Sequence, residues 1–364
     1  MRHRFHALCP YFAMFPEGFV EKWVDQLTRP GDYILDPFSG RGTTPFQALI
    51  MGRKAIANDI NPVAFCVTYA KTNAPSISTI RRRLTILEND FQPNDYEPAR
   101  RFLPPFFRRA FSPPTLRQIL YLRSQLRWKE SNVDCFIAAL ILGSLHGESS
   151  VSPSYLSNQM PRTISTKPEY SMRYWQKKNM RAPRRETFEI LRRLLNFRYA
   201  SEPPVGRATV FLADIRDLPR FKQKLPGRIA CVITSPPYFN VTSYEEDQWL
   251  RLWFLGGPPF PTYREVSKDD RHENPTAYWN MITDMWRVFG LILAPNANIV
   301  VRFGGKGYEP NQLIDAMTAC SVVSRRRVRL AHHAVSVIKN KQTDVFRPGS
   351  KGCKFEVDCH FRMG

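Results

Sequence analysis

The chain has 364 residues, of which 53 are lysine or arginine and 32 are aspartate or glutamate, so its formal net charge is +21. This length accommodates one large domain or two ordinary ones, with an ample hydrophobic core. The positive charge favours a polyanionic partner, and nucleic acid is the first candidate. The alternative is a basic soluble protein that has no such partner.

The seven cysteines are scattered and form no Cys-x-x-Cys pair. This spacing argues against a zinc site and against a disulfide framework, and we expect no metal. No apolar run reaches the length of a membrane span, and the amino end lacks the long apolar segment of a signal peptide. We therefore expect no membrane partner and a location in the reducing cytoplasm.

The first elements expected along the chain are an amphipathic helix at 17–27 and a short apolar strand at 33–36. The strand runs into Asp36-Pro37-Phe38-Ser39-Gly40-Arg41-Gly42-Thr43-Thr44, a glycine-rich turn that leads into a helical pattern at 45–50. The two glycines would let the backbone approach a ligand closely.

A second apolar run, at 55–57, ends in Asn58-Asp59-Ile60-Asn61-Pro62, and a helix is expected from 62 to about 72. An acidic residue about 20 residues beyond a glycine-rich turn is the arrangement that binds a ribose diol. The turn lacks the third glycine of the dinucleotide pattern, so no pyrophosphate need be bound.

Residues 76–204 differ in character from the segments on either side. Helices are expected from 81, at 115–126, at 132–146 and at 185–197, and the third is so apolar that it should be buried. Between the last two lies a polar run, from 147 to about 183, that we expect to be irregular. It mixes phosphate-binding cations with stackable aromatic side chains. Its candidates for contact with nucleic acid are Arg162, Arg173, Tyr174, Trp175, Lys177, Lys178, Arg181 and Arg184. The alternative is a helical lid with solvated charge.

The strand pattern resumes at 208–212, followed by Asp214, and returns at 228–234. The second of these runs ends in Thr234-Ser235-Pro236-Pro237-Tyr238. The prolines fix φ and cannot donate ladder hydrogen bonds, so the strand must stop there. The result is a stiff loop at the carboxyl end of a strand, where open α/β sheets bind their ligands.

The remaining elements expected are helices at 244–255, 276–293 and 311–320, and strands at 297–303, 328–339 and 354–361. The last two strands should form a terminal antiparallel hairpin. The glycine-rich stretch 304–307 is interpreted as a plain turn, with a phosphate contact as the alternative.

The glycine-rich turn and the proline loop together resemble the motifs of S-adenosylmethionine-dependent DNA methyltransferases that modify exocyclic amines, as in restriction–modification systems. Ser-Pro-Pro-Tyr resembles the N4-cytosine enzymes, while Asp or Asn in the first position is more usual for N6-adenine. The resemblance covers roughly residues 1–75 and 205–364. It implies an α/β fold with a Rossmann-like methyltransferase sheet, mostly parallel with a terminal antiparallel hairpin, plus a mainly helical insert. Residues 1–75 would be the cofactor-binding half, 76–204 a candidate target-recognition region and 205–364 the catalytic half.

The resemblance also implies roles for individual residues, with S-adenosylmethionine as the cofactor. The residues implied to bind it are Tyr11, Phe15, Asp36, Pro37, Phe38, Gly40, Gly42, Thr43, Asp59, Ile60, Asp214 and Thr234. The residues implied to act in catalysis are Ser235, Pro236, Pro237 and Tyr238.

The chemistry of an exocyclic amine explains why such a loop is needed. The nitrogen lone pair is delocalised into the base, so an enzyme assists by accepting hydrogen bonds from the amine. Ser235 Oγ and the Pro236 carbonyl are the candidate acceptors, held ready by the rigid loop, and Tyr238 would stack on the base. A base in duplex DNA must first be flipped out of the helix. No covalent intermediate is needed, which argues against a C5-cytosine enzyme.

Several alternatives stay open at the level of sequence. The expected partner is double-stranded DNA, bound by a monomer associated with a bacterial-type nucleoid, with a cognate restriction endonuclease as a further partner. The rivals are an N6-adenine enzyme, an exocyclic-amine RNA methyltransferase, and a nucleic-acid-binding protein that has lost catalysis. Because the insert precedes Asp214, loop 239–275 could share target recognition with it.

Overall fold

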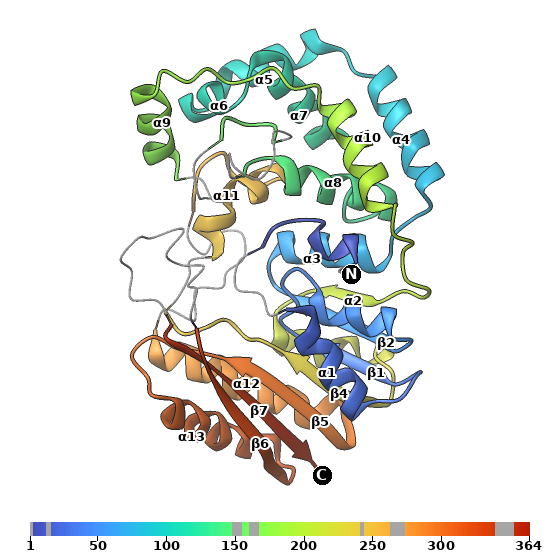
Figure 1. The fold of residues 1–364 in the computed structure, drawn as a ribbon, viewed down its shortest axis with the longest axis vertical. Helices are drawn as coiled ribbons and strands as arrows, with labels where there is room; N and C mark the ends of the chain where they lie inside the picture. Colours follow the sequence, from blue (N-terminus) through green and yellow to red (C-terminus); the bar gives the residue numbers. More distant parts are fainter. Residues whose placement is uncertain are drawn as a thin grey trace. The chain divides into compact units, whose positions relative to one another are not determined.

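The computed structural model describes residues 3–11, 16–147, 155–159, 167–240, 244–262, 274–338 and 353–364, apart from the side chains of residues 222 and 244. The chain folds into two compact units, each built from several segments (Figure 1). The helical unit comprises Met1–Pro10, Tyr69–Pro203 and Tyr244–Val266, and the sheet unit comprises Tyr11–Thr68, Pro204–Ser243 and Ser267–Gly364. Segments 1–10 and 244–266 of the helical unit lie outside the insert expected at 76–204.

The sheet unit is built on a seven-stranded sheet with the order β3-β2-β1-β4-β5-β7-β6. The strands β1 to β5 are parallel, and β7 runs antiparallel to both β5 and β6. Their bounds are β1 Tyr33–Asp36, β2 Lys54–Asp59, β3 Thr209–Leu212, β4 Ile229–Thr234, β5 Leu293–Phe303, β6 Val328–Val337 and β7 Phe355–Met363. The predicted Rossmann-like sheet, mostly parallel with a terminal antiparallel pair, is confirmed.

Both faces of the sheet are covered, which explains why its central strands are apolar throughout. Ile34 and Ile233 point to the side of α1 (Glu17–Leu27) and α2 (Thr43–Ile50). Leu35 and Val232, their chain neighbours, point to the opposite side, where α12 (Pro275–Ile292), α13 (Pro310–Cys320) and η3 (Ile215–Lys224) pack. The remaining elements of this unit are α3 (Pro62–Thr72), whose last turn belongs to the helical unit, and η5 (Ser321–Ser324).

The strand order places a switch point between β1 and β4. From β1 the chain moves outward to β2 and β3, and then returns to the other side of β1 as β4. Crevices for ligands open at the carboxyl ends of strands at such a point. The ends of β1, β2, β3 and β4 carry the glycine-rich turn, Asp59, Asp214 and the Ser-Pro-Pro-Tyr loop, respectively.

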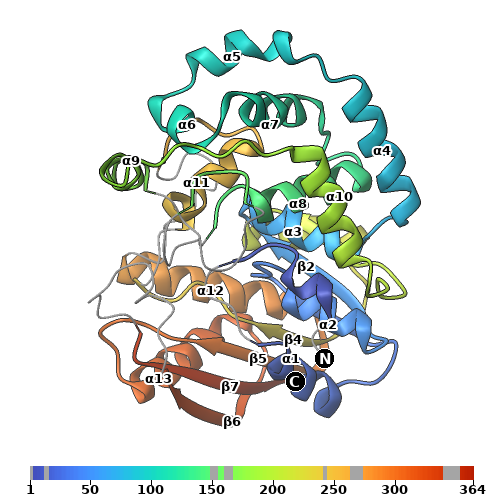
Figure 2. The ribbon, with the colours of Figure 1, turned by 45° about the horizontal axis from the view of Figure 1, so that its top comes forward.

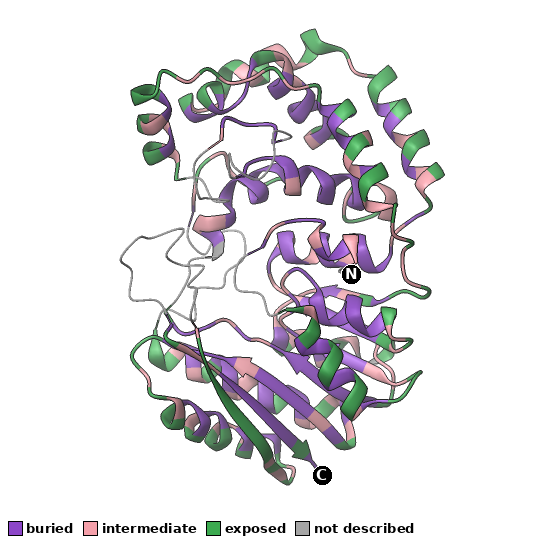
Figure 3. Ribbon diagram, viewed as in Figure 1, coloured by how far each residue is buried: buried purple, intermediate pink, exposed green. Residues whose placement is uncertain are grey.

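The helical unit is built around its own helix α8 (Asn132–Ser144). Almost all residues of α8 are buried, as its apolar sequence predicts (Figure 3). The other helices of this unit are η1 (Arg4–Ala7), α4 (Ile77–Asn89), η2 (Pro93–Tyr96), α5 (Glu97–Phe102), α6 (Pro105–Ala110), α7 (Pro113–Gln125), α9 (Pro168–Lys177), α10 (Thr187–Arg198) and α11 (Tyr244–Phe254). Among the described helices of both units, none combines the length and the apolar character that crossing a membrane requires.

The expectation of irregular chain from 147 to about 183 is wrong for 168–177, which form α9 (Figure 2). This helix begins with a proline at its first position, where the missing N–H costs nothing. It packs through Ser171 and Trp175, four residues apart and therefore on one face. Trp175 lies 5.7 Å from Phe106 of α6, measured between ring centroids. The other residues of α9 are mostly polar, which is why the apolar periodicity is weak.

Candidate active site

Two residues of the glycine-rich turn after β1 have a backbone geometry that favours glycine. Gly40 has φ +52° and Gly42 has φ +71°, in the left-handed region that other residues rarely enter. A Cβ at Gly42 would lie 2.6 Å from Thr68 Oγ1. The same hydroxyl donates a hydrogen bond of 3.1 Å to the Gly40 carbonyl. Helix α3 therefore holds the turn in place.

Asp36, at the end of β1, is joined directly to the end of β4. The Thr234 hydroxyl donates to Asp36 Oδ1 over 2.6 Å, and the Phe38 amide donates to the same oxygen over 3.2 Å. Burial raises the pKa of Asp36 to about 6, and the hydrogen bond from Thr234 offsets part of this rise. One buried carboxylate thus ties the glycine-rich turn to the start of the Ser-Pro-Pro-Tyr loop.

Asp59, at the end of β2, faces the glycine-rich turn. Its Oδ2 accepts a hydrogen bond of 2.8 Å from the Gly40 amide, and its Oδ1 accepts one of 2.9 Å from the Asn61 amide. The Asp59 carboxylate therefore connects the end of β2 to the glycine-rich turn. Asp59 is half-buried, as a residue that contacts a ribose would be.

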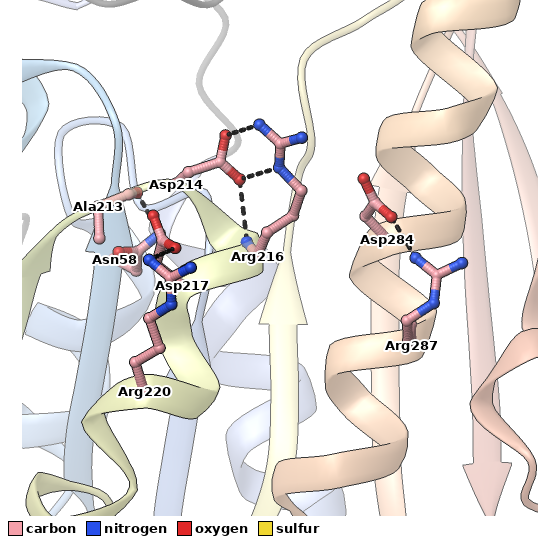
Figure 4. Close-up of polar contacts among 8 residues, drawn as sticks. All are labelled: Asn58, Ala213, Asp214, Arg216, Asp217, Arg220, Asp284 and Arg287. Carbon is pink, nitrogen blue, oxygen red and sulfur yellow. Dashed lines mark hydrogen bonds and ion pairs between the residues drawn. The ribbon is translucent and has the colours of Figure 1, made fainter.

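Asn58 and Asp214 lie at the ends of β2 and β3 (Figure 4). The Asn58 amide group donates to the carbonyls of Pro37 and Ala213, at 3.2 and 3.1 Å, and so links three strand ends. The Asp214 carboxylate accepts two hydrogen bonds of 3.0 Å from the Arg216 guanidinium and one of 2.9 Å from the Arg216 amide. The last bond caps the start of η3.

The Ser-Pro-Pro-Tyr loop rests on the glycines that follow β5. The Phe239 amide donates to the Gly304 carbonyl at 3.2 Å, and the Lys306 amide donates to the Phe239 carbonyl at 3.1 Å. A Cβ at Gly304 would lie 3.3 Å from the Tyr238 ring, and one at Gly305 would lie 3.3 Å from Phe239 Cβ. Stretch 304–307, interpreted from sequence as a plain turn, supports the loop by close backbone approach.

Within the loop, Ser235 and Pro237 are half-buried, whereas Pro236 is buried. Tyr238 is only 8% exposed, which leaves little of its ring for stacking on a base. Its hydroxyl donates to Glu356 Oε1 on β7 at 2.9 Å. No motif in the sequence indicates Glu356, because strand pairing is what brings β7 to the loop.

The remaining residues predicted to bind the cofactor gather around the same turn. A Cβ at Gly40 would lie 3.6 Å from the Tyr11 ring. Pro37 is buried, Phe38 and Ile60 are half-buried, and the Thr43 hydroxyl accepts a hydrogen bond of 3.3 Å from Arg41. Phe15 lies outside the described residues.

The residues predicted to contact nucleic acid belong to the helical unit. Arg173, Lys177, Lys178 and Arg181 are exposed and form no ion pair with the described residues, and Tyr174 is half-buried. Arg184 is exposed and pairs with Glu186 at 3.0 Å. Arg162 lies outside the described residues.

Trp175 does not fit the predicted role of a stacking aromatic. It is fully buried, and its indole N–H donates to the Gln159 carbonyl at 3.1 Å. Its ring therefore has no exposed face on which a base could stack.

Within the described ranges, no group of three or more histidine, cysteine, aspartate or glutamate side chains is placed to hold a metal ion. The strand ends do fit S-adenosylmethionine. Asn58 Oδ1 is buried and lacks a hydrogen-bond partner in the described part of the chain, and a bound ligand can satisfy such an acceptor. The turn at Gly40 and Gly42 presents backbone rather than side chains to a ligand.

Comparison with known proteins supports the resemblance inferred from the motifs. Residues 3–69 match the model of the N6/N4 methyltransferase family, described as DNA methylase. This segment contains the glycine-rich turn, Asp36 and Asp59. The resemblance to restriction–modification-type DNA methylases is therefore confirmed over these residues.

Two curated relatives match short parts of the chain. Type II methyltransferase M.MjaII of Methanocaldococcus jannaschii is 32% identical over 84 residues, which are 23% of this chain and 16% of that protein. Type II methyltransferase M.Cfr9I of Citrobacter freundii is 30% identical over 71 residues, which are 20% of this chain and 24% of that protein. The matches thus span less than a quarter of the length of either relative.

Among solved structures, TrmN from Thermus thermophilus matches at 10% identity and a TM-score of 0.39, over 100% of this chain and 52% of that one. The rRNA methyltransferase aviRa from Streptomyces viridochromogenes matches at 13% identity and a TM-score of 0.35, over 100% of this chain and 93% of that one. TM-scores this low support no inference about fold or function.

Proposed function

We propose that this chain is an S-adenosylmethionine-dependent DNA methyltransferase that transfers a methyl group to the exocyclic N4 amine of cytosine. The observation that carries the proposal is the hydrogen bond of 2.6 Å from Thr234 to Asp36. It joins the ends of β1 and β4, so the glycine-rich turn and the Ser-Pro-Pro-Tyr loop begin side by side at the same edge of the sheet. A cofactor motif and an amine-binding motif must meet in this way if a methyl group is to pass between their ligands.

The cofactor would be held at the ends of β1, β2 and β3. The glycine-rich turn approaches it through backbone, the Asp59 carboxylate accepts hydrogen bonds from the ribose hydroxyls, and Asp214 accepts one from the adenine amine. The Tyr11 ring beside Gly40 covers the turn. S-adenosylmethionine supplies an electrophilic methyl group on a sulfonium.

Ser235 Oγ and the Pro236 carbonyl would accept hydrogen bonds from the target amine. These hydrogen bonds favour a pyramidal nitrogen, whose lone pair is localised on the nitrogen and no longer delocalised into the base. The loop is held by two backbone hydrogen bonds to stretch 304–307, so its acceptors need not reorganise during the reaction. The amine proton finally passes to solvent.

The serine that opens the loop favours cytosine over adenine, for which Asp or Asn is more usual. The N6-adenine reaction is the second candidate, because the same acceptors serve either amine. An RNA substrate is the third. The curated relatives are both type II methyltransferases, which favours DNA.

Nucleic acid would bind through the exposed cations of α9 and the segment after it. Arg173, Lys177, Lys178 and Arg181 have no acidic partner among the described residues. Free cations of this kind neutralise phosphates. The proposal thus keeps the insert 76–204 as the target-recognition region, double-stranded DNA as the substrate and a monomer in the cytoplasm. A cognate restriction endonuclease remains a proposed partner.

Nucleoside mass spectrometry on DNA from cells that express the protein tests this proposal. We expect N4-methylcytosine with the wild type and its loss with Ser235→Ala, which removes one amine acceptor. Ser78→Ala is the matched control, because Ser78 is an exposed serine on α4 and its loss should leave the modification intact.

The other outcomes distinguish the candidates. N6-methyladenine in place of N4-methylcytosine would keep the mechanism and overturn the choice of base. Modified nucleosides in RNA alone would replace DNA as the substrate. A wild type that methylates neither DNA nor RNA would refute the enzymatic proposal.

A further inference from the structure

The Ser-Pro-Pro-Tyr loop is tied to the antiparallel edge of the sheet by a chain of side chains. The Tyr238 hydroxyl donates to Glu356 Oε1 at 2.9 Å, and Glu356 Oε2 lies 3.5 Å from Arg302 Nη1. Arg302 also donates two hydrogen bonds to Asp358, of 2.6 and 2.7 Å. These contacts therefore run from the loop after β4 to Glu356 on β7, from there to Arg302 on β5, and back to Asp358 on β7; β5 and β7 are neighbours in the sheet.

The Arg302–Asp358 end of this series of contacts is rigid. Arg302 and Asp358 face each other in the β5–β7 register, and both side chains are 12% exposed. The Arg302 guanidinium lies 3.9 Å above the Phe19 ring of α1. Two planar hydrogen bonds and a ring beneath leave the guanidinium a single orientation. Glu356 therefore pairs with a guanidinium, that of Arg302, which is itself held in one orientation.

The Tyr238 end of this series of contacts is also confined by packing. The Tyr238 ring is 8% exposed and packs so closely on Gly304 that a Cβ there would lie 3.3 Å away. Burial and the nearby Glu356 carboxylate hold the pKa of Tyr238 well above its usual range, so its hydroxyl keeps the proton that it donates. Ser235, three residues earlier, has its side chain against this hydroxyl.

We propose that Tyr238, Glu356 and Arg302 are positioning residues, which hold the loop so that Ser235 Oγ and the Pro236 carbonyl meet the target amine. This inference rests on the proposed function. It assigns Tyr238 a role through its hydroxyl, in place of the expected stacking of its ring on the base. Glu356 and Arg302 then belong to the methyl-transfer site, although both lie in strands beyond the two motifs.

The two roles for Tyr238 predict different results for Tyr238→Phe. A stacking ring loses nothing when it becomes phenylalanine, which has the same face. A hydroxyl anchor loses its only bond to Glu356, and the loop gains freedom. Displacing reacting groups by about 1 Å can cost a hundredfold in rate.

The experiment measures methyl transfer by Tyr238→Phe, Glu356→Ala, Glu356→Gln and the double variant Tyr238→Phe/Glu356→Ala. We expect Tyr238→Phe and Glu356→Ala each to lower kcat by about ten- to a hundredfold, with KM for DNA and cofactor changed less than about threefold. Glu356→Gln keeps an acceptor for the hydroxyl and should recover part of the rate. The double variant should be no slower than the slower single variant, because both remove the same bond.

A second readout does not depend on activity. The unfolding equilibrium constants of the wild type, the two single variants and the double variant, measured in urea, should show the same non-additivity. Tyr308→Phe is the matched control, since Tyr308 packs near Phe239 but its hydroxyl bonds Trp279 at 3.1 Å. It should keep the wild-type kcat.

Wild-type kcat in Tyr238→Phe would overturn the inference and restore the stacking role. Additive losses of rate in the double variant would also overturn it, because the two side chains would then act separately. An inactive wild type would instead refute the proposed function, which distinguishes the two failures.

Discussion

Asp36 is the residue whose chemistry depends most on the fold around it. Its carboxylate is 1% exposed, and burial raises its pKa to about 6 from an ordinary value of 3.8. Between these two pH values the native state therefore binds more protons than the unfolded chain. The stability that Asp36 contributes is present below about pH 4 and is lost as the pH rises through about 6.

This linkage gives a prediction for Asp36→Asn, which keeps the shape of the side chain and cannot ionise. Between pH 4 and pH 7.5 the wild type should lose up to about 3 kcal/mol of stability that the variant does not lose. Urea unfolding of both proteins across this range measures the difference, and the contributions of all other groups cancel in the comparison. A difference that does not change with pH would contradict the prediction.

At single residues, the sequence indicated Asp36, Thr234 and Ser235, because each lies in a motif with a recognisable local pattern. It could not indicate Glu356, which meets Tyr238 across 118 residues of chain. The sequence near Tyr238 and near Glu356 contains no pattern that indicates this pairing. The β5–β7 register creates it, and a register follows from the packing of the whole sheet.

At the level of elements, the buried strands and long helices were predictable, whereas α9 was not. Strands β1 and β4 read as short apolar runs because both faces of the sheet are covered. Helix α9 has ten residues, and only Ser171 and Trp175 are buried, so its sequence resembles a polar loop. A short helix anchored by one large side chain gives too few apolar positions for a period to show.

The glycine-rich turn offers a prediction about how one element holds another. Gly42→Ala must adopt φ +71° and place its Cβ 2.6 Å from Thr68 Oγ1 on α3. Gly52→Ala is the matched control, because its φ is +75° but nothing lies within 4 Å of an added Cβ. The left-handed backbone alone costs about 1–2 kcal/mol, and overpacking adds about 1–3 kcal/mol.

We therefore expect Gly42→Ala to be less stable than Gly52→Ala by about 1–3 kcal/mol. Urea unfolding at one pH measures both losses. Equal losses of unfolding free energy in the two variants would show that Thr68 moves aside without destabilising the protein. The turn would then not be held in place by α3.

For the whole molecule, chain order is a poor guide to which segments fold together. The segment after the Ser-Pro-Pro-Tyr loop joins the helical unit, where the Trp253 ring lies 4.5 Å from the Phe107 ring. Arg251 of α11 donates to the Leu142 carbonyl at 3.0 Å and the Pro10 carbonyl at 2.8 Å, and so binds three distant segments into this unit. Such contacts follow from tertiary packing, and no local pattern in 244–254 indicates them.

The net charge of +21 raises the question of whether nucleic acid responds to the field of the whole molecule or to particular cations. Lys177→Gln/Lys178→Gln removes two exposed cations at the end of α9, while Arg82→Gln/Lys129→Gln removes two exposed cations elsewhere in the helical unit. Arg82 belongs to α4, on the other side of this unit from α9 (Figure 2). The two double variants carry the same net charge, so a response to the field alone would be equal.

If α9 contacts phosphates, only the first pair should reduce the dependence of DNA affinity on salt. Each phosphate contact adds about 0.9 to the magnitude of the slope of log affinity against log salt concentration. The loss of both Lys177 and Lys178 should therefore reduce that magnitude by up to about 1.8. Fluorescence anisotropy with a labelled duplex, titrated at several salt concentrations, measures the slopes. Equal slopes for the two variants would remove α9 from the proposed interface, because binding would then depend on the net charge and not on where the cations lie.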